Sequence, residues 1–238
     1  EKVGSVETAA VVKANAYGHG VEQIAPVLQT AGCKSFFVAT LEEAIQLRLL
    51  LPNAEIHVLN GILPGWPEVM HEHKLRPVLN SLYQVNLWLR HVEHLEEVVL
   101  ADLHIDTGMS RLGFSKKELV IYLQTPAFSK TIKLDLVLSH LAAADTPDHP
   151  MNSEQLDIFH KLKPHFMGQR ASLAASSGIF LGPKYHFDLV RPGVALFGGN
   201  PVPGKPNPMK QVVRITGRIL QVRSVDTPQV VGYGATYQ

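Results

Sequence analysis

The sequence of 238 residues contains a single cysteine, Cys33, which excludes an internal disulfide framework and any cysteine-rich metal site. Its 22 Lys and Arg residues nearly balance its 21 Asp and Glu residues, so charge gives no reason to expect nucleic acid or a membrane surface as a partner. Apolar runs such as residues 97–103 fall well short of the roughly 20 residues that a membrane-spanning helix needs. We therefore expect a globular protein of a reducing compartment, the cytoplasm, with the periplasm as the alternative.

Two further patterns are missing. The sequence has no P-loop and no isolated Gly-x-Gly-x-x-Gly after a predicted strand, so nucleotide-phosphate chemistry has no support. Its histidine pairs, at 71 and 73 and at 91 and 94, fall on amphipathic helices without the carboxylate–histidine arrangement typical of zinc. We therefore predict no metal site.

Strand-like apolar runs alternate with amphipathic segments of helical length over the first 200 residues. Eight strands are predicted, at 8–14, 35–39, 55–60, 76–80, 98–106, 132–140, 171–176 and 188–197. Helices are predicted between them, at 21–31, 41–51, 66–74, 82–96, 116–125 and 153–166. Connections of helical length imply parallel strands. The fold class is therefore α/β, and eight units favour a TIM-type (β/α)8 barrel, with an open doubly wound sheet as the alternative.

The composition changes at residues 200–208, NPVPGKPNP, whose prolines can neither continue a helix nor occupy a central strand. We predict a barrel over residues 1–200, a linker over 201–210 and the beginning of a mostly β domain over 211–238. Within that last part, residues 212–225 are predicted as one or two strands. About 30 residues cannot bury a core of their own. Since the sequence also begins with Glu rather than Met, we expect a fragment of a longer protein.

Polar side chains follow several of the predicted strands, where barrel enzymes carry their reacting groups. They are Lys13, Arg111, His140, Ser176 and Arg191. Each one alone is most simply a solvated residue at a strand end. Five of them around one barrel mouth predict a functional site, with the Lys13 amine as a candidate nucleophile or base.

Six motifs carry a resemblance to a known family. The segment KANAYGHG at 13–20 resembles the pyridoxal-phosphate lysine motif of the alanine racemases. The other motifs follow in the family's order: IDTGMSRLG at 105–113, SHLAAAD at 139–145, AASSG at 174–178, VRPGVALFG at 190–198 and GYGATY at 232–237. The resemblance covers nearly the whole chain in collinear blocks.

The resemblance implies a homodimeric enzyme of fold type III that interconverts L-alanine and D-alanine with pyridoxal 5'-phosphate, supplying D-alanine for bacterial peptidoglycan. Racemisation removes a proton from one face of Cα and returns one to the other face, so two acid–base groups are required. The resemblance assigns the first to Lys13, which also holds the cofactor. It assigns the second to Tyr233, acting in the partner's site.

The resemblance also implies which residues bind the cofactor. It directs Arg191 at the pyridine nitrogen, where a guanidinium keeps its own proton and leaves the ring unprotonated. We expect this to suppress transamination. His140 is expected to orient Arg191 through hydrogen bonds. The phosphate contacts fall to Tyr17, Ser176, Gly193 and Val194.

Arg111 is expected near the cofactor phenolate and the substrate carboxylate. His104 stands close to it in the sequence, where many relatives carry a lysine, carbamylated in some, that holds the arginine. A neutral imidazole cannot supply that negative charge, so what positions Arg111 stays open.

Three other functions are weighed against alanine racemisation. A broad-specificity amino-acid or serine racemase of the same fold shares these motifs, and a panel of substrates would distinguish it. A non-catalytic barrel that binds pyridoxal phosphate shares the lysine but lacks the segment around Tyr233. The related decarboxylases of basic amino acids are expected to place an acidic group where this sequence has Arg191.

Overall fold

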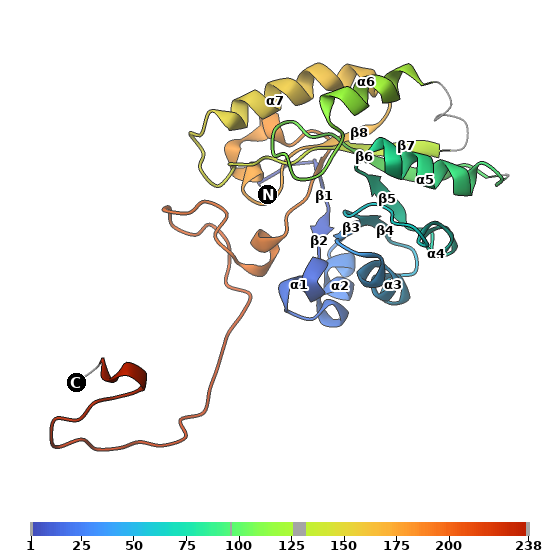
Figure 1. Cartoon of the computed structure of the whole chain (residues 1–238). Coiled ribbons are helices and arrows are strands. Elements are labelled where there is room, and N and C mark those ends of the chain that lie inside the picture. The colour runs from blue at the N-terminus through green and yellow to red at the C-terminus, as the bar shows by residue number, and fades with distance from the viewer. Residues whose placement is uncertain (1, 96, 126–131, 237–238) are drawn as a thin grey trace.

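The computed structural model describes residues 2–95, 97–125 and 132–236, in which strands and helices alternate along the chain (Figure 1). The strands are β1 (Glu7–Thr8), β2 (Ala10–Val11), β3 (Ser35–Val38), β4 (Glu55–Val58), β5 (Arg76–Leu79), β6 (Val99–His104), β7 (Ile132–Leu138), β8 (Arg170–Ser172) and β9 (Leu189–Val190). The helices are α1 (Lys13–Tyr17), α2 (Val21–Thr30), α3 (Leu41–Leu50), α4 (Pro67–Glu72), α5 (Leu82–Val92), α6 (Lys116–Gln124) and α7 (Met151–Leu162). None of the helices in these ranges is both long and apolar enough to cross a membrane.

The strands form a closed parallel barrel. Strands β2 to β8 pair in chain order, and β1 pairs with β9. A parallel bridge between Ala175 and Arg191 joins the segment after β8 to the one after β9. On the other side of β9, the Val11 amide donates to the Pro192 carbonyl over 2.9 Å. Since β1 and β2 are two parts of one strand, the ring contains eight strands. The predicted (β/α)8 barrel is confirmed and the open sheet is excluded.

Alternate residues of the strands divide the apolar side chains into two clusters, as the period of two in a strand requires. The outward cluster, which includes Phe36 and Leu103, packs against helix residues such as Leu47 and Trp88. The inward cluster lies inside the barrel and consists of Ala9, Val11, Phe37, Val78, Leu136, Leu138 and Leu189. The barrel is therefore a packed core below its carboxyl-end mouth.

Two of the helices begin at capping boxes. The Thr40 side chain accepts from the Glu43 amide at the start of α3, and Glu43 bonds back to the Thr40 amide. Ser115 and Glu118 form the same reciprocal pair at α6. Such pairs satisfy amides that have no partner within the helix. The structure confirms the predicted helix starts at 41 and 116.

The segment after the barrel runs away from it as an extended chain (Figure 1). Asn207 ties the linker to the barrel by donating to the Gly198 carbonyl over 2.8 Å. The prediction of strands within 212–225 is wrong for this chain, since the structure shows none there and side chains such as Ile215 and Leu220 are exposed. A strand needs a neighbouring strand for its amides and carbonyls, and no described residue supplies one. The division into domains stays a prediction.

Candidate active site

A cavity of about 570 Å³ opens at the carboxyl ends of the strands, a size typical of sites for small ligands. Eight of the predicted site residues line it: Lys13, Tyr17, Arg111, His140, Ser176, Arg191, Gly193 and Val194. They come from segments far apart in the sequence, and the barrel brings them to one place.

The chain reaches the cavity through a left-handed turn. Ala14, Asn15, Ala16 and Tyr17 all have φ between 51° and 55°, a conformation that costs roughly 1–2 kcal/mol per residue for L side chains. The turn is held by the Gly18 amide, which donates to the Ala14 carbonyl over 2.9 Å, and by the Asn15 side chain, which accepts from the Val21 amide over 2.7 Å. The predicted strand through residue 14 is therefore too long, since β2 ends at Val11. The turn leaves Lys13 and Tyr17 on the cavity wall.

Arg191 forms the floor of the cavity and is 3% exposed. Its guanidinium donates to the Ser172 hydroxyl and, over 2.6 Å, to the Ser139 carbonyl. Burial lowers the pKa of Arg191 to about 10, against the opposing effect of the Asp102 carboxylate. The side chain is therefore charged at neutral pH. The hydrogen-bond partners of the Arg191 guanidinium are thus Ser172 and Ser139, rather than the expected His140.

Both histidines beside Arg191 are neutral at physiological pH. Burial and the neighbouring Arg191 charge lower the pKa of His140 to about 3. The same two causes lower the pKa of His104 to about 4. The site therefore holds its positive charge on arginine and lysine side chains.

The proton on His104 can be placed from its hydrogen bonds. Its Nδ1 lies 2.8 Å from Asn80 Oδ1. The Asn80 amide nitrogen donates to the carbonyls of Leu59 and Val78, which fixes Oδ1 as an acceptor. Nδ1 of His104 therefore carries the proton, and Nε2 is left as an acceptor. Neither the Asn80 contact nor this tautomer is predictable from the sequence.

Ser176 holds the segment that follows Arg191. Its Oγ accepts from the Gly193 amide over 2.9 Å and from the Ala195 amide over 3.2 Å, so the hydroxyl proton is left to be donated. The Gly193 amide therefore donates to Ser176 rather than to a ligand in the cavity. A Cβ on Gly193 would lie 2.2 Å from the Tyr17 hydroxyl, so only glycine admits that phenol here. Burial raises the pKa of Tyr17, which keeps it a neutral donor.

Gln155, on α7, is a site residue that sequence reasoning missed. It is 1% exposed and donates to the Thr107 hydroxyl over 3.0 Å and to the His140 carbonyl over 2.9 Å. Its Oε1 accepts from the Ala142 amide over 2.8 Å. Gln155 thereby fixes the loop after β6 to the loop after β7. In the sequence, a buried glutamine on an amphipathic helix looks the same as a solvent-exposed one, so this role could not be predicted.

Arg111 and Tyr233 differ in where they lie. Arg111 lines the cavity with its side chain exposed. Tyr233 lies in a short 3₁₀ helix, Tyr233–Ala235, is fully exposed, and is not part of the cavity wall. Its role in a partner's site stays a prediction.

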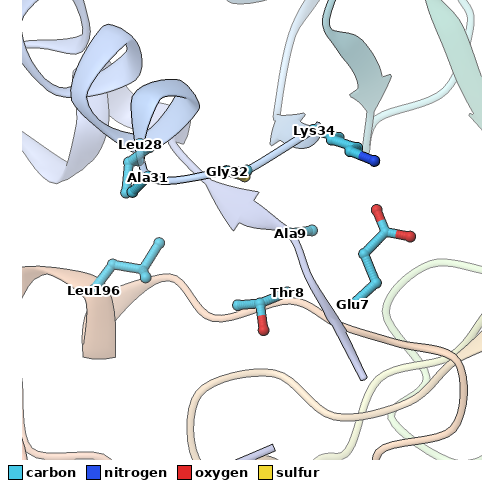
Figure 2. Close-up of a pocket in the computed structure, with 9 residues that line it drawn as sticks. Glu7, Thr8, Ala9, Leu28, Ala31, Gly32, Lys34 and Leu196 are labelled. Carbon is cyan, nitrogen blue, oxygen red and sulfur yellow. The ribbon is translucent and has the colours of Figure 1, made fainter. Parts of the chain in front are cut away.

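A second hollow, of about 490 Å³, lies beside β1 and the end of α2 (Figure 2). Its wall contains none of the predicted catalytic or cofactor-binding residues. Cys33 is part of this wall, and its thiol donates to the Ser35 carbonyl over 3.3 Å. Burial raises the pKa of Cys33 to about 11, so the thiol is protonated and unreactive at neutral pH. This hollow has no set of groups for chemistry.

The fold and the cavity define a parallel (β/α)8-barrel protein whose cavity at the carboxyl ends of the strands is lined by a lysine, a buried arginine and a serine hydroxyl. The chain belongs to the alanine racemase family, since the family described as "Alanine racemase, N-terminal domain" matches residues 1–201.

Three similar proteins illustrate the relationship. The alanine racemase of Rhodospirillum rubrum is 49% identical over 230 residues, which cover 96% of this chain and 62% of the relative. The crystal structure of the Bartonella henselae alanine racemase with covalently bound pyridoxal phosphate superposes with a TM-score of 0.85 at 41% identity, over 88% of this chain and 61% of that one. A histidine racemase from Leuconostoc mesenteroides gives a TM-score of 0.83 at 26% identity, over 99% of this chain and 65% of that one. The chain thus spans about three-fifths of the length of these proteins.

Proposed function

We propose that the full-length protein containing this chain is an alanine racemase that uses pyridoxal 5'-phosphate to interconvert L-alanine and D-alanine. The observation that carries the proposal is the presence of Lys13, Ser176 and Arg191 around one cavity at the barrel mouth. The similar enzymes named alanine racemase, one of them with covalently bound pyridoxal phosphate, support the same cofactor and substrate here. Supply of D-alanine for peptidoglycan in a bacterial cytoplasm is part of this proposal.

The residues of the cavity suit that cofactor. Ser176 has a hydroxyl proton to donate and Tyr17 is a neutral phenol, and both are donors that a phosphate group accepts from. Val194, in the loop with Gly193, also lines this side of the cavity. Two N–H groups of Arg191 donate to the described residues Ser172 and Ser139. Its other N–H groups are available to donate to a ring nitrogen. When bound, the cofactor supplies an electron sink that weakens the Cα–H bond of the amino acid.

Arg191 then determines where protons reside. A guanidinium with a pKa of about 10 keeps its protons at neutral pH and can only donate to the ring nitrogen. An acidic side chain in its place would protonate that nitrogen. Holding the nitrogen unprotonated limits how far the charge at Cα spreads into the ring. This favours returning a proton to Cα over transamination.

Lys13 acts on one face of the substrate Cα, both holding the cofactor and moving the proton through its amine. Tyr233 of a partner subunit acts on the opposite face. The proposal therefore includes a homodimer and the domain that begins at residue 211, since that domain carries Tyr233. A phenol with a pKa near 10 needs cationic neighbours to act as a base at neutral pH. Arg111, exposed on the cavity wall, is available to bind the substrate carboxylate.

A broader amino-acid racemase of the same fold is the second candidate. The likeness to a histidine racemase over 99% of this chain favours keeping it. A panel of L-amino acids, each scored for its D-enantiomer by chiral chromatography, separates the two. Turnover of alanine well above all others supports the first candidate, and comparable turnover of larger substrates supports the second.

The test uses the full-length protein loaded with pyridoxal phosphate. Borohydride reduction followed by peptide mapping is expected to place the cofactor adduct on Lys13. K13A is expected to lower racemisation of L-alanine by about 10²–10⁴-fold, the range typical of a lost acid–base group. K116A removes an exposed lysine on α6 and serves as the matched control. An adduct on another lysine, or full activity of K13A, would overturn the proposal.

A further inference from the structure

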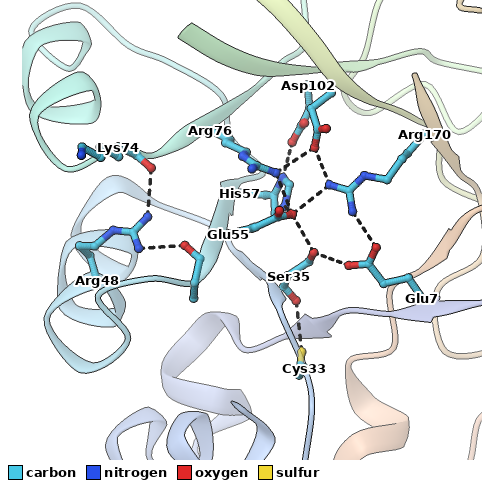
Figure 3. A network of polar contacts seen from close by, with 12 residues as sticks. Glu7, Cys33, Ser35, Arg48, Glu55, His57, Lys74, Arg76, Asp102 and Arg170 are labelled. Carbon is cyan, nitrogen blue, oxygen red and sulfur yellow. Dashed lines mark hydrogen bonds and ion pairs between the residues drawn. The ribbon is translucent and has the colours of Figure 1, made fainter. Parts of the chain in front are cut away.

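A buried acid–base pair lies inside the barrel, within the polar network drawn in Figure 3. His57 on β4 and Asp102 on β6 are both 0% exposed, and their Nδ1 and Oδ2 atoms are 2.5 Å apart. The His57 ring stacks on Phe37 with centroids 4.3 Å apart. His57 Nε2 and Asp102 Oδ1 have no hydrogen-bond partner in the part of the chain that the structure describes. Such a pair needs an explanation, because unpartnered buried polar atoms are costly.

The strand register places Asp102 directly below the active-site cavity. Asp102 pairs with Leu136, and His104 pairs with Leu138. Arg191 donates to the carbonyl of Ser139, the residue after Leu138. Inward-facing positions recur every two residues, so Asp102 lies one layer, about 7 Å, beneath the level at which Arg191 is bound.

The surroundings of Arg191 include cationic side chains and also the acidic residues Asp106 and Asp145. Its two hydrogen-bond partners are neutral. The other titratable groups that share its electrostatic environment are Lys13, Arg111, His104 and His140. Asp106 and Asp145 are acidic groups on the loop side, and Oδ1 of Asp106 accepts from the amides of Gly108 and Ser110. Asp102 is the carboxylate that acts on Arg191 from below.

His57 faces a second acidic group on its far side. Its Nε2 lies 4.0 Å from Glu55 Oε2, and Glu55 is itself bonded by Arg76 and Arg170. Glu55 thus belongs to the ion-pair network at the amino ends of the strands. His57 Nδ1 and Asp102 Oδ2 share a short hydrogen bond, and Asp102 acts on Arg191 as an opposite charge. A buried cation without such an anion is strongly destabilising.

We propose that Asp102 is a positioning residue: held by His57, its carboxylate is the counter-charge that keeps the Arg191 guanidinium charged and in place beneath the cavity. The inference rests on the proposed function only where it concerns the ligand of Arg191. The interaction between Asp102 and Arg191 does not depend on it. It adds to the cavity residues a group that touches neither substrate nor cofactor.

The first experiment measures the dissociation constant of pyridoxal phosphate in the full-length protein for wild type, D102N, R191Q and the double variant. D102N is expected to weaken binding by about tenfold, since a neighbouring charge of this kind shifts a pKa by one unit or more. In the R191Q background the same change is expected to have less than a twofold effect. D135N, which removes a carboxylate at the amino ends of the strands, is the matched control and is expected to bind as wild type does. An equal loss in both backgrounds, or none in D102N, would overturn the proposal.

The second experiment needs no cofactor. Urea unfolding of the same four proteins is expected to show that D102N is more destabilising with Arg191 present than in the R191Q background. If wild type fails to bind pyridoxal phosphate, the proposed function falls while this cycle still decides the role of Asp102. Additive free energies of unfolding would show that Asp102 does not act through Arg191.

Discussion

At the scale of single residues, Gly193 shows how a missing side chain shapes the cavity. The Tyr17 hydroxyl occupies the space where a Cβ would be, and its ring Cζ would lie 2.9 Å from that Cβ. The Gly193 amide at the same time donates to Ser176. One position therefore sets the place of two of the proposed phosphate donors.

G193A is expected to displace the Tyr17 ring and to weaken binding of pyridoxal phosphate to the full-length protein by about tenfold or more, the effect of losing a hydrogen bond to a charged group. Gly193 has φ of −124°, outside the left-handed region, and a Cβ there would meet the Tyr17 ring. Fluorescence titration of the cofactor measures it. G217A is the control, because a Cβ at Gly217 meets nothing within 4 Å. Equal affinities of G193A and wild type would contradict this account.

The same scale shows which site residues the sequence can predict. Lys13, Ser176 and Arg191 stand in motifs at strand ends, so both their presence and their meeting at one mouth are predictable. The partners of Arg191 are not, because the Ser139 contact uses a backbone carbonyl that every residue has. Gln155 and Asn80 are missed because a buried amide and a solvated one look alike in a sequence.

At the scale of elements, the left-handed turn after β2 stands out. Four successive residues without glycine occupy a conformation that glycine tolerates best. The apolar run TAAVV at 8–12 predicts a strand that continues into this segment, and no glycine between this run and Gly18 marks the change of hand. The capping boxes at α3 and α6, by contrast, are local patterns of side chain and amide, and their positions are predictable.

A14G is expected to raise the free energy of unfolding by about 1 kcal/mol, because glycine removes the left-handed penalty at an exposed position. A31G is the matched control. Ala31 is also exposed but has φ of −75°, so glycine there is expected to lower stability by about 0.5–1 kcal/mol. Urea unfolding measures both changes. The same sign for both variants would show that the turn is not strained.

At the scale of the whole molecule, a network of charges closes the end of the barrel opposite the cavity (Figure 3). Arg170 donates to Glu7 over 2.7 Å, to Glu55 over 2.9 Å and to Asp135 over 2.5 Å. Arg76 donates to Glu55 and Asp135 over 2.8 Å each. These residues belong to five strands around the ring. In the sequence these charged residues look like ordinary surface residues, so no pattern predicts the network.

R170Q is expected to lower the free energy of unfolding by about 3 kcal/mol, since it leaves partly buried carboxylates with too little positive charge. Burial by itself raises the pKa of Glu55, but Arg76 and Arg170 outweigh it and lower that pKa to about 2. A lowered carboxyl pKa adds stability above the unfolded value near 4.5, which is lost as the pH falls toward 2. The deficit of R170Q is therefore expected to be largest at neutral pH and to shrink through that window.

K163Q is the control for this prediction. It removes an exposed ion pair with Asp188, at 3.5 Å, and is expected to change stability by less than about 1 kcal/mol at any pH. Urea unfolding at several pH values compares the two variants. A pH-independent deficit in R170Q would indicate lost packing rather than lost charge pairing.

The seam of the barrel links assembly to chemistry. Strands from the two ends of the barrel sequence meet there, and the Val11 amide bonds to the Pro192 carbonyl. Lys13 and Arg191 lie on either side of this junction. In a chain whose barrel has not closed, neither side chain is in the position that it has on the cavity wall. Contacts between such distant segments form late, because their loop-closure cost is paid first. We therefore expect the cavity wall to be complete only once this junction has formed, and to be lost when the junction opens.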